Sequence, residues 1–243
     1  MSPPLKGISS MATRQVLAEL AAAWHARGGA AIAIEAVGGV EAARRVAAGA
    51  EAFDVVFLAS DAIDRLLAAG RVVAGSRVDL MRSATAVAVP AGAARPDLGS
   101  EAAVRAAVLA APGVGCSTGP SGVALRALFD RWGIAGEIAP RIVQAPPGVP
   151  VAALVADGRV ALGFQQLSEL IHVPGIDIVG PLPPAIAIGT TFSAGVATGA
   201  PNAAAARQLL AFLASPAADA AKRRQGMQPV HSTPVSRSPT EHA

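Results

Sequence analysis

The sequence has little of several residue types whose abundance marks particular classes of protein. Its 243 residues include a single cysteine, Cys116, and no tyrosine. A lone cysteine excludes an internal disulfide and a cysteine-based zinc site. Charged residues make up 15% of the chain and aromatic residues 3%, and the formal net charge is only +3. Nucleic-acid binding requires a basic surface with aromatic side chains that stack on bases, so we expect no nucleic-acid partner.

Long uninterrupted apolar runs are also missing, although 52% of the residues are hydrophobic. The uncharged interval between Asp177 and Arg207 is broken by prolines, glycines and hydroxyl residues. A transmembrane helix needs about 20 consecutive apolar residues, so we expect a chain that does not span a membrane. Residues 1–10 lack the basic start and apolar block of a signal peptide. As written, the chain is therefore expected in the cytoplasm, or in the periplasm if a leader was removed.

Apolar, β-rich runs alternate with Ala- and Leu-rich helical patterns along most of the chain. This alternation predicts an α/β fold with parallel, doubly wound sheets, which the length allows as one large domain or two lobes. Ligands of such sheets bind where the carboxyl ends of the strands meet the loops. Strands are predicted near residues 5–8, 30–34, 55–58, 84–89, 113–116, 142–144, 160–164 and 176–179.

Residues 113–129 combine the end of a predicted strand with the start of a helix. Pro120 suits the first helical position, with Gly119 or the residue before it as the cap. The unpaired N–H groups and the dipole at a helix start favour bound anions. The same segment contains Gly-Cys-Ser-Thr-Gly at 115–119, which matches the G-x-S-x-G nucleophile elbow and makes Ser117 a candidate hydrolase nucleophile. The segment is thus either an anion site or part of a catalytic triad.

The triad interpretation lacks well-placed partners. A triad in the order of the elbow-containing hydrolases needs a later acid, such as Asp157 or Asp177, followed by a histidine. His172 and His231 are candidate histidines, and His231 lies in a polar, Pro-rich tail. A serine hydrolase that uses Ser117 is therefore a remote alternative.

Small or neutral polar residues follow several other predicted strands as well. Because the carboxyl ends of parallel strands face one side of a sheet, these loops are expected to form one site. Such a site holds an anion with hydroxyls, amides and backbone N–H groups in place of positive charges. Asp54, directly before a buried strand, is expected to be structural, because its carboxylate would repel an anion. The expected ligand-binding residues are Ser9, Ser10, Gly38, Gly39, Ser117, Gly119, Ser121, Gly122, Gly148, Val149, Gln165 and Gln166.

The order and spacing of several segments resemble the type II periplasmic binding protein family, in its molybdate-binding-protein-like branch. These segments are residues 7–21, 51–60, 119–122, 161–170 and 210–216. The resemblance implies two α/β lobes joined by two crossing strands, with the ligand in the cleft between the lobes. If the crossings lie near 83–89 and 190–196, residues 1–83 plus 192–243 form the first lobe, with a tail from about 228, and residues 84–191 form the second. It also implies a monomer without metal or cofactor, and an ABC permease as partner if the protein is exported.

The resemblance to molybdate-binding proteins is uneven among the residues that are expected to contact the ligand. Their first-loop serine corresponds to Ser9 or Ser10, but their second, serine-rich loop is replaced by residues 37–40, which offer only backbone donors. The tyrosine that they carry near the last cleft loop is replaced around Gln165 and Gln166. These departures favour an organic di- or tricarboxylate over a molybdate-type oxyanion. The combination of motifs is similar to that of aconitate isomerases, which are built on this binding-protein fold.

Two functions follow from this resemblance. The leading one is a solute-binding protein that captures a small organic carboxylate. The alternative is an isomerase that shifts a double bond in an unsaturated tricarboxylate, which needs a base and donors that stabilise an enolate-like charge. Ser10, Glu35 and Ser117 are the candidate catalytic residues, with Glu35 at a strand end that is expected to face the cleft. The remaining candidates are more simply explained as solvated or helix-capping side chains: His25, Glu169 and His172.

Overall fold

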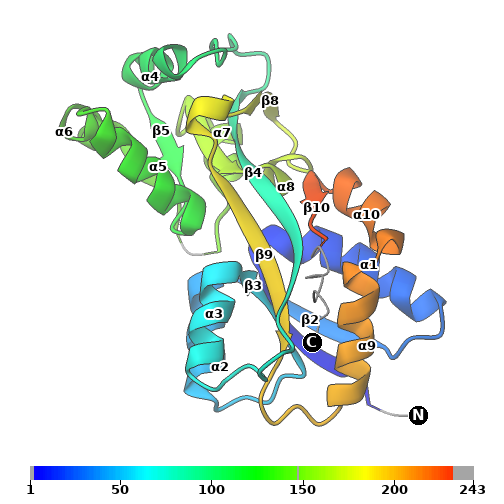
Figure 1. Cartoon of the computed structure of the whole chain (residues 1–243). Helices are drawn as coiled ribbons and strands as arrows, with labels where there is room; N and C mark the ends of the chain where they lie inside the picture. The colour runs from blue at the N-terminus through cyan, green and yellow to red at the C-terminus, as the bar shows by residue number, and fades with distance from the viewer. Residues whose placement is uncertain (1–2, 147, 232–243) are drawn as a thin grey trace, which may run out of the picture.

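The computed structural model describes residues 3–146 and 148–231, in which helices cover a curled, two-part sheet (Figure 1). The strands are β1 (Leu5–Ser10), β2 (Ile32–Val37), β3 (Val55–Ala59), β4 (Val78–Pro90), β5 (Val114–Cys116), β6 (Ile142–Gln144), β7 (Leu162–Gln166), β8 (Ile176–Pro181), β9 (Gly189–Val196) and β10 (Met227–Pro229). The α-helices are α1 (Arg14–Ala26), α2 (Gly39–Ala48), α3 (Ser60–Ala68), α4 (Glu101–Ala110), α5 (Pro120–Arg131), α6 (Ala135–Ile138), α7 (Val151–Ala156), α8 (Leu167–Leu170), α9 (Ala203–Ala214) and α10 (Asp219–Arg224). This is the predicted α/β class.

Two long strands, β4 and β9, join the two lobes (Figure 1). The strand order is β2-β1-β3-β9-β4-β7-β5-β6, and β8 and β10 both pair with β4. The first half of β4 pairs with β9 and β10, and its second half pairs with β7 and β8. β4 and β9 are thus the predicted crossing strands. The predicted lobe boundaries fall inside or beside them and stay a prediction.

The predicted tail begins later than expected. Gln228 and Pro229, which the sequence places in it, belong to β10 and pair with Arg82 and Met81 of β4. The rest of the predicted tail, residues 232–243, lies outside the described residues.

The first lobe has a core on each face of its sheet, because successive side chains of a strand point to opposite faces. Leu5 and Phe57 pack on the α1 and α9 side, whereas Ile8 and Leu58 pack on the α2 and α3 side. A sheet covered on both faces explains why all of β3 is buried. In the second lobe, Phe164 joins the core beneath α4 and α5. Among the described residues, no helix combines the length and the apolar character needed to cross a bilayer.

A buried lysine marks the packing of α10. Lys222 has no exposed surface, and its Nζ lies 3.9 Å from Oδ1 of Asp219, without a hydrogen-bond partner in the described part of the chain. Asp219 also faces Arg223 at 3.5 Å and the His231 ring at 3.0 Å. Burial lowers the pKa of Lys222.

The lowered pKa predicts a pH-dependent stability difference. Below its pKa in the folded protein, Lys222 is charged in both the folded and the unfolded state, and its buried charge destabilises the fold. Near pH ~10.4 the lysine also becomes neutral in the unfolded chain, so this destabilisation disappears. Lys222→Met is therefore expected to raise the free energy of unfolding by about 1 kcal/mol at neutral pH, because Asp219 keeps its other two partners. The gain in the free energy of unfolding should shrink toward zero as the pH approaches the pKa of Lys222 in the unfolded chain. Urea unfolding across this range measures it, with Lys6→Met as the control at the chain's other lysine. A gain that stays constant with pH contradicts the prediction.

Candidate functional site

A cleft of about 600 Å³ lies between the two lobes. The first lobe supplies the end of β1 and the starts of α2 and α3. The second lobe supplies the loop after β5, the loop before α7, and the corner between β7 and α8. The carboxyl ends of strands therefore meet at one place, as expected for an α/β fold.

All of the predicted ligand-binding residues except Ser9 and Gly122 line this cleft. Ser9 precedes Ser10 on β1, so its side chain points to the opposite face of the sheet, where it borders a groove with Arg14 and Ile34. Gly122 lies in the first turn of α5, and a Cβ built on it would come 1.9 Å from the carbonyl oxygen of Ser117. Its role is thus to allow close backbone packing of the loop that carries Ser117.

Several helices begin at the cleft with free backbone donors. α5 begins at Pro120 with Gly119 as its N-cap, as predicted. The N-caps of α2, α5 and α7 are Gly38, Gly119 and Pro150, and none of the three caps its helix through a side chain. In α7, one first-turn donor, the backbone N of Ala152, is taken by Oε1 of Gln165. Free N–H groups and helix dipoles therefore add partial positive charge to the cleft wall, where the cationic side chain among the described lining residues is Arg65, paired with Asp61.

Hydroxyl and amide groups add further ligand-binding capacity. The Ser117 and Ser121 hydroxyls lie 3.1 Å apart. Gln166 donates from Nε2 to Oγ1 of Thr190 at 2.6 Å. Its Oε1 and the Oγ of Ser10 are buried without a hydrogen-bond partner among the described residues. An unpaired buried polar group costs roughly 1–3 kcal/mol, so these two atoms favour a ligand that pairs with them.

Three carboxyl side chains line the cleft, and one differs from the others. Glu41 accepts from Arg44 at 2.7 Å, and Asp61 accepts from Arg65 at 2.8 Å. Glu169, on the short helix α8, has no ion-pair partner among the described residues. Enclosure by apolar neighbours raises the pKa of Glu169 to about 7.

Gln165 connects the corner of the chain that carries Glu169 to helix α7. Its Oε1 accepts a hydrogen bond from the backbone N of Ala152, in the first turn of α7, at 3.1 Å. The side chain of Gln165 also acts on Glu169, where it opposes the effect of burial and lowers the pKa of that carboxyl group. The sequence predicts a solvated or helix-capping side chain here; in the structure Glu169 lies in the first turn of α8, where it is partly buried and lines the cleft. The sequence feature that could have identified Glu169 as a cleft residue is its position, one turn after a strand that ends in two glutamines.

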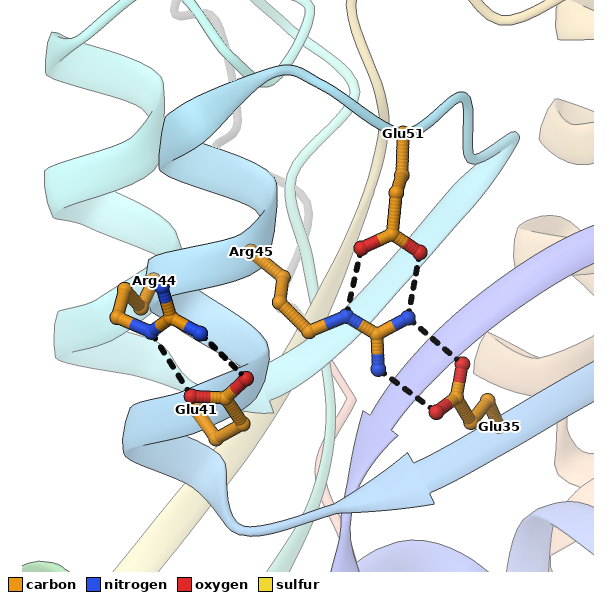
Figure 2. Close-up of polar contacts among 5 residues, drawn as sticks. All are labelled: Glu35, Glu41, Arg44, Arg45 and Glu51. Carbon is orange, nitrogen blue, oxygen red and sulfur yellow. Dashed lines mark hydrogen bonds and ion pairs between the residues drawn. The ribbon is translucent and has the colours of Figure 1, made fainter.

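Glu35 lies outside the residues that line the cleft and instead faces Arg45, as Figure 2 shows. β2 continues two residues beyond Glu35, and the register partner of Glu35 on β1 is Ile8, which faces α2 and α3. Arg45 of α2 donates to Glu35 at 2.7 Å and to Glu51 at 2.5 Å. The hydrogen bond from Arg45 lowers the pKa of Glu35, which makes this carboxylate a weaker base.

The described residues do not assemble a hydrolase triad around Ser117. The side-chain hydrogen bond of Ser117 is to Ser121. His172 pairs with the Gln225 side chain at 2.5 Å, and His231 pairs with an aspartate of α10 at 3.0 Å. Neither histidine lines the cleft. Among the described residues, the structure therefore shows no histidine partner for Ser117, and the serine hydrolase alternative has no support from it.

Known proteins support the two-lobed interpretation. Residues 5–228 match the family model of bacterial extracellular solute-binding proteins. An aconitate isomerase from Pseudomonas sp. is 41% identical over 182 residues, which cover 74% of this chain and 69% of that protein.

Solved structures of anion-binding proteins share the fold. The periplasmic molybdate-binding protein of Azotobacter vinelandii superposes with a TM-score of 0.77 at 22% identity, covering 94% of this chain and all of that one. The sulfate-binding protein SubI of Mycobacterium tuberculosis H37Rv gives a TM-score of 0.76 at 15% identity, covering 94% and 88%. The predicted type II periplasmic binding protein resemblance is confirmed. The chain belongs to the family of bacterial extracellular solute-binding proteins and has the two-lobed fold of its periplasmic members.

Proposed function

We propose that the cleft binds an unsaturated tricarboxylate of the aconitate type and shifts its double bond. The observation that carries this proposal is the carboxyl group of Glu169 in the wall of a cleft built for anions. For capture alone, a carboxylate beside an anionic ligand is unfavourable, because like charges repel. For isomerisation, a base at this place is required. The 41% identity to an aconitate isomerase supports the same conclusion.

The reaction needs a proton transfer and no redox partner. A base removes a proton from the methylene carbon next to the double bond, and the electron pair of the broken C–H bond spreads through the allyl unit into a carboxylate. A proton then returns to the far carbon of that unit, so that the double bond has moved and all atoms are conserved. The helix starts at Gly39 and Pro120, together with the unpaired Ser10 hydroxyl, would stabilise the negative charge of the intermediate.

Conversion of trans-aconitate tests this proposal. We expect the purified protein to change the ultraviolet absorbance of trans-aconitate and to yield cis-aconitate, which chromatography identifies. Thermal shifts with citrate, molybdate and sulfate serve as the comparison, and the tricarboxylate is expected to stabilise the protein most. Stabilisation by trans-aconitate without any conversion would overturn the isomerase function.

Capture of a carboxylate without chemistry is the second candidate function. The uncharged donors of the cleft favour it, because they bind an anion without forming a buried ion pair. A tightly bound, unchanged tricarboxylate is the result that would support it.

A further inference from the structure

We infer that Glu169 is the catalytic base of the cleft and that Gln165 is the residue that positions it. This inference rests on the proposed isomerase function. Of the three carboxyl groups that line the cleft, Glu169 is the one without an arginine partner in the described part of the chain. The hydrogen bond from Arg44 lowers the pKa of Glu41, so this carboxylate is a poorer base, and Asp61 is held in an ion pair with Arg65.

The position of Glu169 is fixed by its own helix and by its neighbour. α8 follows β7 directly, and on this helix the backbone N of Ser168 donates to Oγ of Ser83 in β4 at 3.5 Å. Gln165, which is buried, is held by the first turn of α7 through its Oε1, and its side chain acts on the neighbouring carboxyl group of Glu169. A base anchored in this way reaches a bound substrate with little loss of side-chain entropy.

The surroundings of Glu169 suit a base that works near neutral pH. Burial raises its pKa to about 7, so at neutral pH the carboxylate form is present and is still a useful proton acceptor. The other charged side chains that line the cleft are Glu41, Asp61 and Arg65, and no histidine or lysine is among its described lining residues. β7 and the 3₁₀ turn η1 (Met11–Thr13), which pack against α8, carry no charged residue. β4 also packs against α8 and carries Asp79, which pairs with Arg77, and Arg82, whose guanidinium group lies near Gly189.

The transfer begins when an Oε atom of Glu169 takes the methylene proton, as the C–H bond breaks and its electron pair enters the allyl unit. Neutral Glu169 then returns a proton to the far carbon and regains its charge. Gln165 touches no reacting atom in this scheme. It keeps the carboxylate in place and moderates its proton affinity.

Glu169→Gln tests the base, because it keeps the shape of the side chain and removes its basicity. We expect kcat for trans-aconitate to fall about 10²- to 10⁴-fold, the usual contribution of a positioned base. Incorporation of deuterium from D₂O into the substrate, followed by NMR, should fall in parallel. Glu169→Asp keeps a carboxyl group and should retain part of the activity, while Glu35→Gln should match the wild type.

Binding of propane-1,2,3-tricarboxylate, which has no double bond, supplies a readout that needs no turnover. In the wild type, affinity should weaken as the pH rises through about 7, because Glu169 becomes charged beside the anion. In Glu169→Gln this weakening should be absent. Calorimetry measures both, and it also shows whether the variant still folds and binds.

Gln165→Met tests positioning through the pH profile of kcat/KM. In the wild type, kcat/KM should rise with pH through about 7, as the base loses its proton. Loss of the Gln165 hydrogen bond should move this rise upward by roughly one pH unit, since one unit corresponds to a weak charge-assisted hydrogen bond. A merely structural role would lower the rate without moving the profile, and that result would overturn the assignment of Gln165.

The outcomes separate the inference from the function on which it rests. No conversion by the wild type overturns both the isomerase function and the base. Conversion by the wild type with equal activity in Glu169→Gln overturns the base alone and leaves the function standing. Conversion by the wild type with an inactive Glu169→Gln that still binds the tricarboxylate supports both.

Discussion

Gly122→Ala is expected to lower the free energy of unfolding by about 3 kcal/mol and to weaken tricarboxylate binding more than tenfold. The added methyl group would lie 1.9 Å from the carbonyl oxygen of Ser117 and 2.7 Å from its carbonyl carbon. These are backbone atoms, which cannot rotate away as a side chain would. The loop must therefore move, and it carries the hydroxyl and N–H donors of the cleft.

Gly136→Ala is the matched control for this change. Gly136 is also helical, in α6, but a Cβ built on it meets no atom within 4 Å. Alanine is a better helix former than glycine, so this variant should be neutral or up to about 1 kcal/mol more stable. Urea unfolding and calorimetry of both variants give the comparison. If Gly122→Ala unfolds and binds like the control, the close approach to Ser117 has no importance for the site.

Asp54→Ala is expected to destabilise the protein by about 3 kcal/mol and to leave the cleft intact in the molecules that remain folded. Asp54 is 3% exposed, and its two oxygens accept hydrogen bonds from the backbone N of Lys6 and of Asn202, each at 2.9 Å. The side chain thus ties β1 to the start of α9. Its removal would leave two backbone donors unpaired at a site that excludes water.

Asp54→Asn provides the graded comparison, because it keeps one acceptor oxygen and should cost less than the alanine variant. Both are measured by chemical unfolding, with ligand affinity determined under conditions where the fold is populated. An alanine variant within about 0.5 kcal/mol of the wild type would contradict the structural role of this carboxylate. A selective loss of affinity without loss of stability would instead place Asp54 in the site.

The helix start at Pro120 illustrates what can be predicted from local sequence. Gly119 and Pro120 are adjacent, and the preference of proline for the first helical turn needs no knowledge of the rest of the fold. Ser9 and Ser10 show where this approach stops. The two serines are adjacent and identical, so the sequence cannot show which of them lines the cleft. Only the register of β1 with its neighbouring strands decides which side chain points into it.

The sequence pattern alone could not show which of Glu35 and Glu169 lies in the cleft. Glu35 precedes the end of its strand by two residues, so a small error in the strand boundary changes its expected environment. Glu169 stands on a helix of four residues, which is too short for periodicity to identify a buried face. Its surroundings come from β4 and η1, both far away in sequence, as well as from the adjacent strand β7, and burial there raises its pKa.

The place of β9 in the sheet bears on how the protein forms during synthesis. β9 lies between β3 and β4, with Val55 opposite Val196 and Val78 opposite Ala194. The sheet of the first lobe therefore stays split until residue 196 has left the ribosome, whereas β4 to β8 of the second lobe are all present by Pro181. Domains fold as their chain emerges, so the half of the molecule encoded first is completed last.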